Sequence, residues 1–265
     1  MTTKPAKPGA PSTTADTSAS AETPPATALD FVRDRVVRAH PRLRVLILQH
    51  PQEQDALLGT APLVVASLER SALRVGLSWA SLAHALEEEE AEPSRWAVMY
   101  RGSLGRELTE RELAMPTLLL DRKSQRKSPD ELHLDGIVVL DGTWSQAKAL
   151  WWRNPWLLKL NRVLLHPKEP SAYGRLRKQP SNQHVSTLEA VALALDGLGE
   201  DAGVGADLRR LFRTLCQRAR DAGVTNSSGP DALEALAEAA APGARPKGAK
   251  KPAKKRGPKR DDVAF

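Results

Sequence analysis

Short apolar runs alternate with amphipathic segments along the middle of the chain. The runs have strand length and are continuous rather than alternating, which is typical of strands covered on both faces, as in a parallel sheet. They lie at residues 43–51, 95–100, 116–121, 136–141 and 162–167. Because helical segments separate most of them, the pattern predicts an α/β fold with a mostly parallel sheet and helices on both faces.

Apolar residues at helical spacing predict five helices. They cover residues 29–40, 60–73, 144–153, 187–197 and roughly 205–221. Thr60 is the expected N-cap of the second of these helices. Thr143 with Gln146, and Ser186 with Glu189, fit capping boxes at the starts of the third and fourth helices. We find no internal repeat.

The two ends of the chain differ in composition from its middle. Residues 1–28 are almost all Ala, Pro, Thr, Ser and Lys, so we expect a disordered N-terminal segment. Residues 224–265 form an Ala/Pro/Lys-rich basic tail, with one Ala-rich helix expected at 230–240. The predicted domain lies between them, at 29–223.

The net charge of +7 is unevenly placed. Residues 241–265 hold nine Lys/Arg and two Asp, so the other 240 residues balance at 30 against 30. Within that body, residues 141–186 hold eight Lys/Arg and two acids. Two basic zones indicate a polyanionic partner.

Several protein classes do not fit this sequence. No apolar run approaches the ~20 residues of a membrane span, and no secretory signal is evident, so we expect a cytoplasmic protein. The single cysteine, Cys216, excludes an intramolecular disulfide and a multi-cysteine metal site.

The stretch GIVVLDGTWSQAKALWWRNPWL, residues 136–157, holds four of the six tryptophans. Asp141 stands where its apolar run ends and a helix begins, and open α/β sheets bind ligands outside the carboxyl ends of their strands. A purely structural alternative is an Asp-Gly turn and a helix cap, with Trp144 and Trp151 as core residues one heptad apart.

A second stretch, YGRLRKQPSNQHVSTLEAVALAL at 173–195, begins with three cations in four positions. These are Arg175, Arg177 and Lys178. They precede the helix start at Ser186, whose unpaired N–H groups suit a carboxylate or a phosphate. The alternative is a solvated loop followed by a well-capped helix.

Together these two stretches resemble the signature segments of the DTW-domain proteins, and LQHPQEQDALLGTAPL resembles that family's early His-Pro segment. The likeness spans residues 43 to about 197. It implies a tRNA-uridine aminocarboxypropyltransferase, which uses S-adenosylmethionine to place a 3-amino-3-carboxypropyl group on N3 of a uridine. It also implies a fold related to the SPOUT methyltransferases, with a C-terminal trefoil knot around the cofactor.

The resemblance suggests a role for each signature residue. Asp141 is the candidate catalytic base for the N3 proton, or a ligand of the substrate ammonium. Trp144 would wall the cofactor pocket or lie against the sulfonium, and Thr143 would mainly cap the helix. The expected cofactor-binding set is Leu140, Asp141, Thr143, Trp144, Ser186, Thr187 and Leu188. Asp121, after PTLLL, is a second and weaker candidate acid.

Basic and aromatic residues near the signatures are candidates for RNA binding. The expected phosphate contacts are Lys148, Arg153, Arg175, Arg177 and Lys178. Trp151 or Trp152 is a candidate to stack on an exposed base, with core packing expected for at least one of them. The basic tail would add non-specific, salt-sensitive affinity.

The chain departs from many family members, which carry a cysteine cluster with metal-ligand spacing near the N-terminus. Tetrahedral zinc needs three or four Cys or His ligands, and His40 and His50 cannot supply them. We therefore expect no metal, with the early helix covering that edge, and this leaves substrate choice more open than the chemistry.

Two other functions remain compatible with the sequence, namely a SPOUT-type RNA methyltransferase and a non-catalytic RNA-binding protein. The target uridine, a tRNA as against an rRNA target, and the oligomeric state also stay open.

Overall fold

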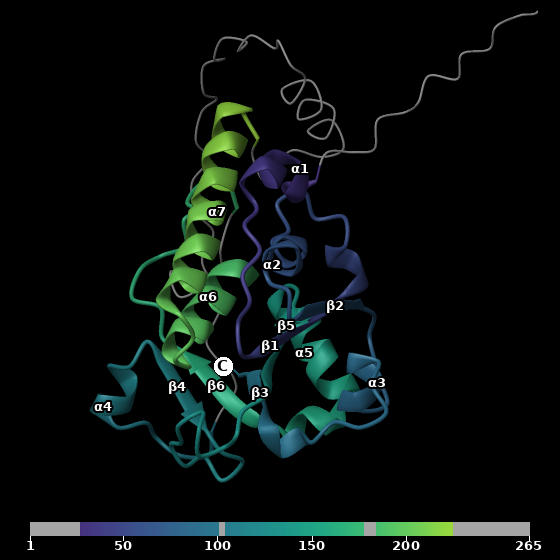
Figure 1. The fold of residues 1–265 in the computed structure, drawn as a ribbon, viewed down its shortest axis with the longest axis vertical. Coiled ribbons are helices and arrows are strands. Elements are labelled where there is room, and N and C mark those ends of the chain that lie inside the picture. Colours follow the sequence, from purple (N-terminus) through teal and green to yellow (C-terminus); the bar gives the residue numbers. More distant parts are fainter. Residues whose placement is uncertain (1–26, 101–103, 178–183, 225–265) are drawn as a thin grey trace, which may run out of the picture.

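The computed structural model of the chain describes residues 27–100, 104–177 and 184–224, which form a six-stranded sheet with helices on both faces (Figure 1). The strands are β1 (Arg44–Gln49), β2 (Ser71–Val75), β3 (Trp96–Met99), β4 (Thr117–Leu120), β5 (Gly136–Asp141) and β6 (Asn161–Leu165). Their order is β2-β1-β5-β3-β6-β4. All neighbours pair in parallel except β4 and β6, which are antiparallel. The predicted mostly parallel α/β sheet is confirmed.

Seven α-helices and four short 3-10 helices accompany the strands in the described residues. The α-helices are α1 (Ala28–Val32), α2 (Ala61–Ser67), α3 (Leu82–Leu86), α4 (Glu110–Leu113), α5 (Trp144–Arg153), α6 (Thr187–Gly197) and α7 (Ala202–Asp221). The 3-10 helices are η1 (Arg33–Arg35), η2 (Pro51–Glu53), η3 (Pro93–Arg95) and η4 (Pro155–Lys159). The bounds predicted for α5 and α6 are confirmed.

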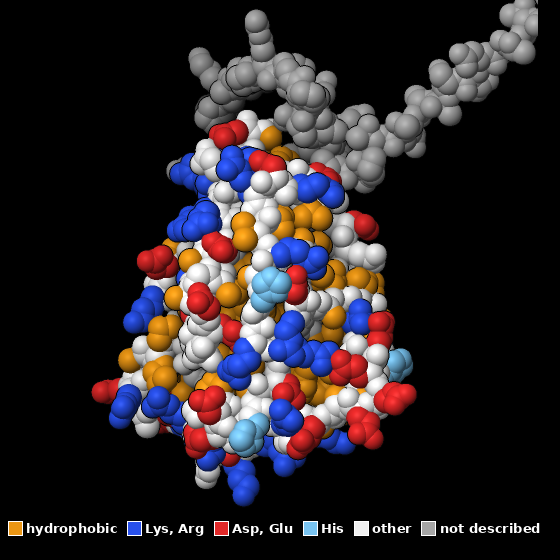
Figure 2. Space-filling view, in the orientation of Figure 1, with side chains coloured by type: hydrophobic (Ala, Val, Ile, Leu, Met, Phe, Trp, Pro, Cys, Tyr) orange, Lys and Arg blue, Asp and Glu red, His pale blue; other side chains and the backbone are white. Residues whose placement is uncertain are grey.

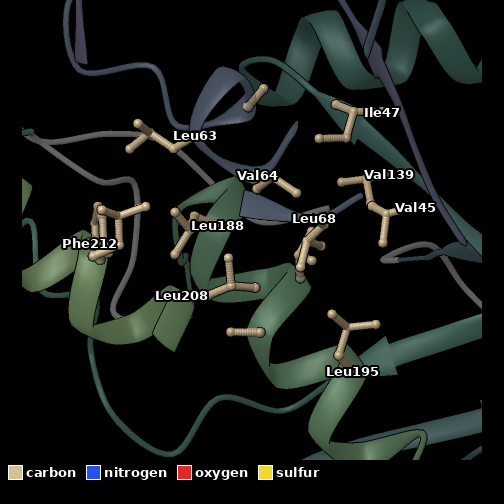
Figure 3. Packing of buried hydrophobic residues seen from close by; sticks show 14 of the residues in the cluster. Val45, Ile47, Leu63, Val64, Leu68, Val139, Leu188, Leu195, Leu208 and Phe212 are labelled. Atoms are coloured by element: carbon tan, nitrogen blue, oxygen red, sulfur yellow. The ribbon is translucent and has the colours of Figure 1, made fainter. Parts of the chain in front are cut away.

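The sheet has an apolar core on each face, which explains the continuous apolar runs. Val45 and Ile47 of β1 belong to a cluster that also includes residues of α1, α2, α6 and α7 (Figure 3). Leu46 and Leu48 of the same strand belong to a second cluster with residues of α3 and η4. Successive strand residues point to opposite faces, so a strand buried on both sides needs apolar residues at every position.

The structure corrects two predicted helices. The helix expected at 60–73 ends at Ser67, and residues 71–75 form the edge strand β2 beside β1. Pairing with β1 decides the conformation there, because the local apolar spacing alone continues the helical pattern. The early helix is also shorter than predicted, since α1 ends at Val32 and only the 3-10 turn η1 follows. The elements α3 and α4 were not predicted.

Three predictions fall mainly on residues outside the described part. Residues 1–26 and 225–265, which include most of the N-terminal segment, the basic tail and the expected helix at 230–240, lie there. Within the described residues, no helix is long and apolar enough to cross a membrane. Nor does any group of three or more His, Cys, Asp or Glu in those residues have an arrangement that could hold a metal ion.

Asn154 fixes the C-terminal end of α5 from a fully buried position. Its Nδ2 donates to the carbonyls of Leu150 (2.8 Å) and Leu77 (3.0 Å), while its Oδ1 accepts from the amide of Trp79 (2.8 Å). One side chain therefore joins the end of α5 to the loop that follows β2.

Replacing Asn154 by Ala leaves these buried backbone groups without their partner. We expect the free energy of unfolding to fall by about 2–4 kcal/mol, because unpaired buried polar groups are costly. Urea denaturation followed by circular dichroism measures the change. Lys159→Ala, at an exposed position on η4, is the control and should stay within about 0.5 kcal/mol of the parent. Equal stability of the two variants would contradict this role.

Candidate functional site

Asp141 is the last residue of β5, at the edge of the sheet where the parallel strands end. It pairs in register with Gln49, the last residue of the neighbouring β1. Gln49 is only 2% exposed, and its Nε2 donates to Asp141 Oδ2 at 2.8 Å. A buried amide therefore fixes one side of the carboxylate.

The other carboxylate oxygen is fixed by the start of α6. Thr187, the first residue of that helix, donates its hydroxyl to Asp141 Oδ1. This contact brings together the two signature stretches, 46 positions apart in sequence. The Asp-Gly-Thr-Trp step and the beginning of α6 thus lie side by side, at the carboxyl edge of the sheet.

The loops after β1 and β5 are locked to each other. The amide of His50 donates to the carbonyl of Asp141 at 3.0 Å, and Gln146 Nε2 donates to Gln52 Oε1 at 3.2 Å. A Cβ at Gly142 would lie 2.9 Å from the Cβ of Gln146 and 3.5 Å from that of His50. The position therefore has no room for a side chain unless its neighbours move. The His-Pro segment takes part in the site through these contacts.

The predicted capping box at the start of α5 is present. The amide of Thr143 donates to Gln146 Oε1, and α5 begins at Trp144. Thr143 is exposed, as is Trp144, while Leu140 is half-buried at the penultimate position of β5. The purely structural alternative, in which Trp144 is a core residue, is wrong, because Trp144 is 57% exposed.

Glu189 organises the start of α6. Its carboxylate accepts from the Ser186 amide (2.8 Å) and hydroxyl (2.9 Å), which completes the predicted capping box. It also accepts from the Ser171 hydroxyl (2.6 Å) and the Ala172 amide (2.9 Å). A single side chain therefore joins the loop that follows β6 to the first turn of the helix.

Two of the first amides of α6 are bonded within the protein. The Leu188 amide donates to Thr60 Oγ1 at 3.2 Å, and the Glu189 amide donates to Ser186 Oγ at 3.1 Å. Leu188 and Ser186 are both buried. Thr60 occupies the predicted N-cap position of α2, but its hydroxyl serves α6 instead. The Thr187 hydroxyl is the part of this helix start that contacts Asp141.

Asp121 does not join the site. It follows β4, which runs antiparallel to β6, so the end of β4 lies at the opposite edge of the sheet from Asp141. Its Oδ1 accepts from the amides of Lys123 (2.8 Å) and Gln125 (2.9 Å) and holds a turn. The expectation of a second acid at the same edge is therefore wrong, because β4 runs against its neighbours.

The residues predicted to contact phosphates differ in their exposure. Lys148, Arg153 and Arg175 are exposed. Arg177 is half-buried, pairs with Glu53 at 3.2 Å and lies 6.0 Å from the ring centre of Tyr173. Its guanidinium thus already holds its own loop against η2. Lys178 lies outside the described residues.

Two other titratable groups nearby are structural. Burial raises the pKa of the Tyr173 phenol, which donates to the carbonyl of Leu58 and packs edge-on against Phe212 at 4.7 Å. Burial also raises the pKa of the Cys216 thiol to about 12. A thiol that stays protonated at neutral pH is a poor nucleophile, so Cys216 serves as a core residue.

Figure 2 shows several acidic side chains on the side where α3 lies. Of the acidic run that follows α3, Glu88 pairs with Arg44, the first residue of β1, at the opposite edge from Asp141. A hollow of about 590 Å³ opens there, lined by Arg44, Trp96 and residues 88–93. This hollow lies at the amino ends of β1 and β3, apart from the candidate site.

Sequence reasoning missed Gln49, Thr60 and Glu189 as parts of the site. One local feature could have identified Gln49, because it is a polar residue that ends β1 directly after four apolar residues. Glu189 was identified only as a helix cap. Its bonds to Ser171 and Ala172, like that of Thr60 to Leu188, join segments that no local pattern connects.

Comparison with known proteins adds family evidence to this geometry. The model of the DTW domain matches residues 30–220. The tRNA-uridine aminocarboxypropyltransferase 2 of Macaca fascicularis is 29% identical over 189 residues, which are 67% of this chain and 56% of that protein. The protein of the same name from Mus musculus is 31% identical over 178 residues, 64% of this chain and 52% of that one.

A third relative, the tRNA-uridine aminocarboxypropyltransferase 2 of Drosophila melanogaster, is 30% identical over 200 residues, 72% of this chain and 70% of that protein. The chain spans just over half the length of the macaque and mouse relatives. No solved structure matches it.

The bonding of Glu189 generates a stability prediction. Glu189→Ala removes the acceptor of four hydrogen bonds, so we expect the free energy of unfolding to fall by about 2–4 kcal/mol. Glu189→Gln keeps one oxygen and should lose less. Chemical denaturation measures both variants, with Glu169→Ala at an exposed position as the control. A Glu189→Ala variant as stable as the control would show that this carboxylate does not hold the helix start.

Proposed function

The chain belongs to the DTW-domain family, and from that membership we propose that it transfers the 3-amino-3-carboxypropyl group of S-adenosylmethionine to N3 of a uridine in tRNA. 5′-Methylthioadenosine would be the second product. The observation that carries the proposal is the carboxylate of Asp141, oriented by Gln49 and Thr187 in the step that resembles the family signature. The names of the three relatives support the reaction class and the tRNA substrate.

The side chains present suit the donor. S-Adenosylmethionine supplies an activated carbon, because its sulfonium turns the adjacent Cγ into an electrophile and leaves as a neutral thioether. Both the sulfonium and the α-ammonium of this donor are cationic. A carboxylate and an exposed indole, Asp141 and Trp144, complement such groups. These two side chains therefore suit S-adenosylmethionine as the donor.

The reaction balances around N3 of the uridine. A bond forms between N3 and the methionine Cγ, and the Cγ–S bond breaks with its electron pair remaining on sulfur. The N3 proton must leave to a base. Asp141 has lone pairs beyond the two that accept from Gln49 and Thr187. We propose that Asp141 either accepts the N3 proton or binds the donor's ammonium group. The two roles predict different effects on kcat and KM.

The remaining signature residues would position the reactants. Trp144 would line the donor site, and Leu140 would contact the donor at the end of β5. Thr143 would hold the turn into α5. Thr187 would act through Asp141, as a positioning residue, and Ser186 would keep the start of α6 in place. Alignment of reacting groups can remove several kcal/mol of barrier, which suits a site with fixed carboxylate geometry.

Exposed cations would hold the RNA. Lys148, Arg153 and Arg175 are available at the surface for phosphate contacts. Arg177, paired with Glu53, would act mainly by shaping the loop that carries Arg175. We also propose the knotted SPOUT-type threading of the C-terminal region. The parallel sheet and the contact of the α6 start with the end of β5 are compatible with it.

The product distinguishes this function from its alternatives. Purified protein incubated with tRNA and S-adenosylmethionine should release 5′-methylthioadenosine, measured by mass spectrometry. S-Adenosylhomocysteine instead would identify an RNA methyltransferase. No product together with tight RNA binding would identify a binding protein.

Asp141→Asn tests the carboxylate. As a base, Asp141 should contribute about 100-fold or more to kcat with little change in the KM for S-adenosylmethionine. If Asp141 instead binds the donor's ammonium group, Asp141→Asn should raise the KM for S-adenosylmethionine. Thr187→Val should show a smaller effect of the same kind. Asp121→Asn, at the opposite edge, is the matched control. Unchanged kcat and KM in Asp141→Asn would remove Asp141 from the mechanism.

Deleting residues 241–265 tests the basic tail, which carries nine Lys/Arg. RNA affinity should fall mainly at low salt, because fewer counterions are released on binding. Turnover at saturating RNA should be unchanged. Filter binding across a salt series, with turnover measured in parallel, gives both quantities. Loss of turnover at saturating RNA would contradict a purely electrostatic role.

A further inference from the structure

The outer face of α5 carries two indoles and an ammonium group in one line. Trp144, Lys148 and Trp152 are spaced four residues apart, so they lie on the same side of the helix, about 6 Å apart along its axis. Trp144 is 57% exposed and Trp152 is 72% exposed. We refer to these three residues as the α5 stripe.

The exposure of these two indoles is exceptional within the protein. Trp96 and Trp156 are buried, and Trp79 and Trp151 are half-buried. Tryptophan has the largest apolar surface of any side chain and usually packs in a core or at an interface. The two exposed tryptophans are both on α5, and both belong to the stripe.

The helix that carries the stripe is firmly held on its inner face. Leu150 is fully buried, and Trp151 packs against Tyr100 with ring centres 5.1 Å apart. The guanidinium of Arg162 lies 5.0 Å from the centre of the Tyr100 ring. The stripe is therefore presented from a fixed support, which reduces the entropy lost when a ligand binds.

Both ends of α5 are tied to the edge of the sheet that carries Asp141. The helix begins three residues after Asp141. At its other end, the Ser78 hydroxyl donates to the carbonyl of Arg153 at 3.0 Å. The loop that contains Ser78 starts at Gly76, whose amide donates to the carbonyl of Gln49 at 3.1 Å. The α5 stripe thus leads away from the candidate site while staying close to it.

The charge around the stripe suits a polyanion. Residues 142–168 contain five Lys/Arg and no Asp or Glu. Four of these cations are exposed, namely Lys148, Arg153, Lys159 and Lys168. Cations interleaved with exposed indoles match the two parts of an unpaired RNA strand, its phosphates and the faces of its bases. An apolar protein partner would not require this charge.

We propose that Trp152 stacks on an unpaired base of the RNA substrate and that Lys148 contacts the intervening backbone. Identifying that base as a neighbour of the reacting uridine rests on the proposed function. Trp144, at the site end of the stripe, keeps its place beside the donor. From Trp144 to Trp152 the helix rises about 12 Å. This is the length of about three or four nucleotides at ~3.4 Å per step of a stacked strand. The target uridine therefore lies in an unpaired segment of at least that length.

The test uses a single-stranded oligouridylate of about 12 nucleotides and an RNA duplex of equal length. Trp152→Ala in the full chain should weaken binding to the single strand by about 5- to 150-fold, the range for loss of one base–aromatic stack. Binding to the duplex, whose bases are not accessible for stacking, should be unchanged. Trp152→Phe should keep most of the affinity. Fluorescence anisotropy measures all of these affinities.

Leu158→Ala is the matched control for Trp152→Ala, and Lys168→Ala is the matched control for Lys148→Ala. Leu158→Ala removes another exposed apolar side chain, 57% exposed on η4, and should leave the affinity unchanged. Lys148→Ala should weaken binding and lower the salt slope by about one. Lys168→Ala, outside the stripe, should have a smaller effect on the single strand.

Two outcomes would overturn the inference. One is a Trp152→Ala variant that binds the single strand like the parent, or loses affinity equally for strand and duplex. The other is a variant whose loss follows a change of oligomeric mass in the absence of RNA, since this would make the stripe a contact between copies of the chain. Neither outcome bears on product formation, so failure of the stripe and failure of the transferase proposal are separable.

Discussion

The hydrogen bond from the Thr187 hydroxyl to the Asp141 carboxylate is the contact on which the candidate site depends. It joins the end of β5 to the beginning of α6, and Gln49 of β1 holds the opposite oxygen. A carboxylate with both oxygens fixed by neutral donors has one orientation toward whatever lies beyond the strand ends. The two donors come from separate elements, β1 and α6. Glu189 holds the start of α6, and Gln146 holds the turn that follows Asp141.

The way in which the α6 start is satisfied restricts what it can bind. A helix N-terminus is often regarded as a ready anion site because its first amides lack partners. Here two side chains, those of Thr60 and Ser186, accept from two of those amides. The helix start therefore works mainly as a support for Asp141 through Thr187. A carboxylate that faces the ligand favours cationic groups, which agrees with the proposed donor and its sulfonium and ammonium groups.

The parts of the fold that could be predicted are those determined by neighbouring residues. Both capping boxes and the bounds of α5 and α6 follow from side chains three positions apart. The direction of β4, and with it the misplaced Asp121, depends on pairing with a strand some 40 residues later in the chain. The strand β2 was taken for helix for the same reason. Of the site, Asp141 and Thr187 were predicted from the resemblance, whereas Gln49, Thr60 and the reach of Glu189 depend on tertiary contacts. Which of Trp151 and Trp152 is exposed could not be predicted either, because it depends on how α5 packs against Tyr100 and the sheet.

The scattered origin of the groups around Asp141 has a consequence for synthesis. Gln49, Asp141 and Thr187 emerge from the ribosome at widely separated times, and the last of them follows all six strands of the sheet. Until α6 has been made and has docked, the carboxylate lacks one of its two donors. Fragments that end between residues 145 and 186 therefore contain the Asp-Gly-Thr-Trp step without the helix start that orients its carboxylate. A truncated or stalled nascent chain would carry the signature and still lack an assembled centre.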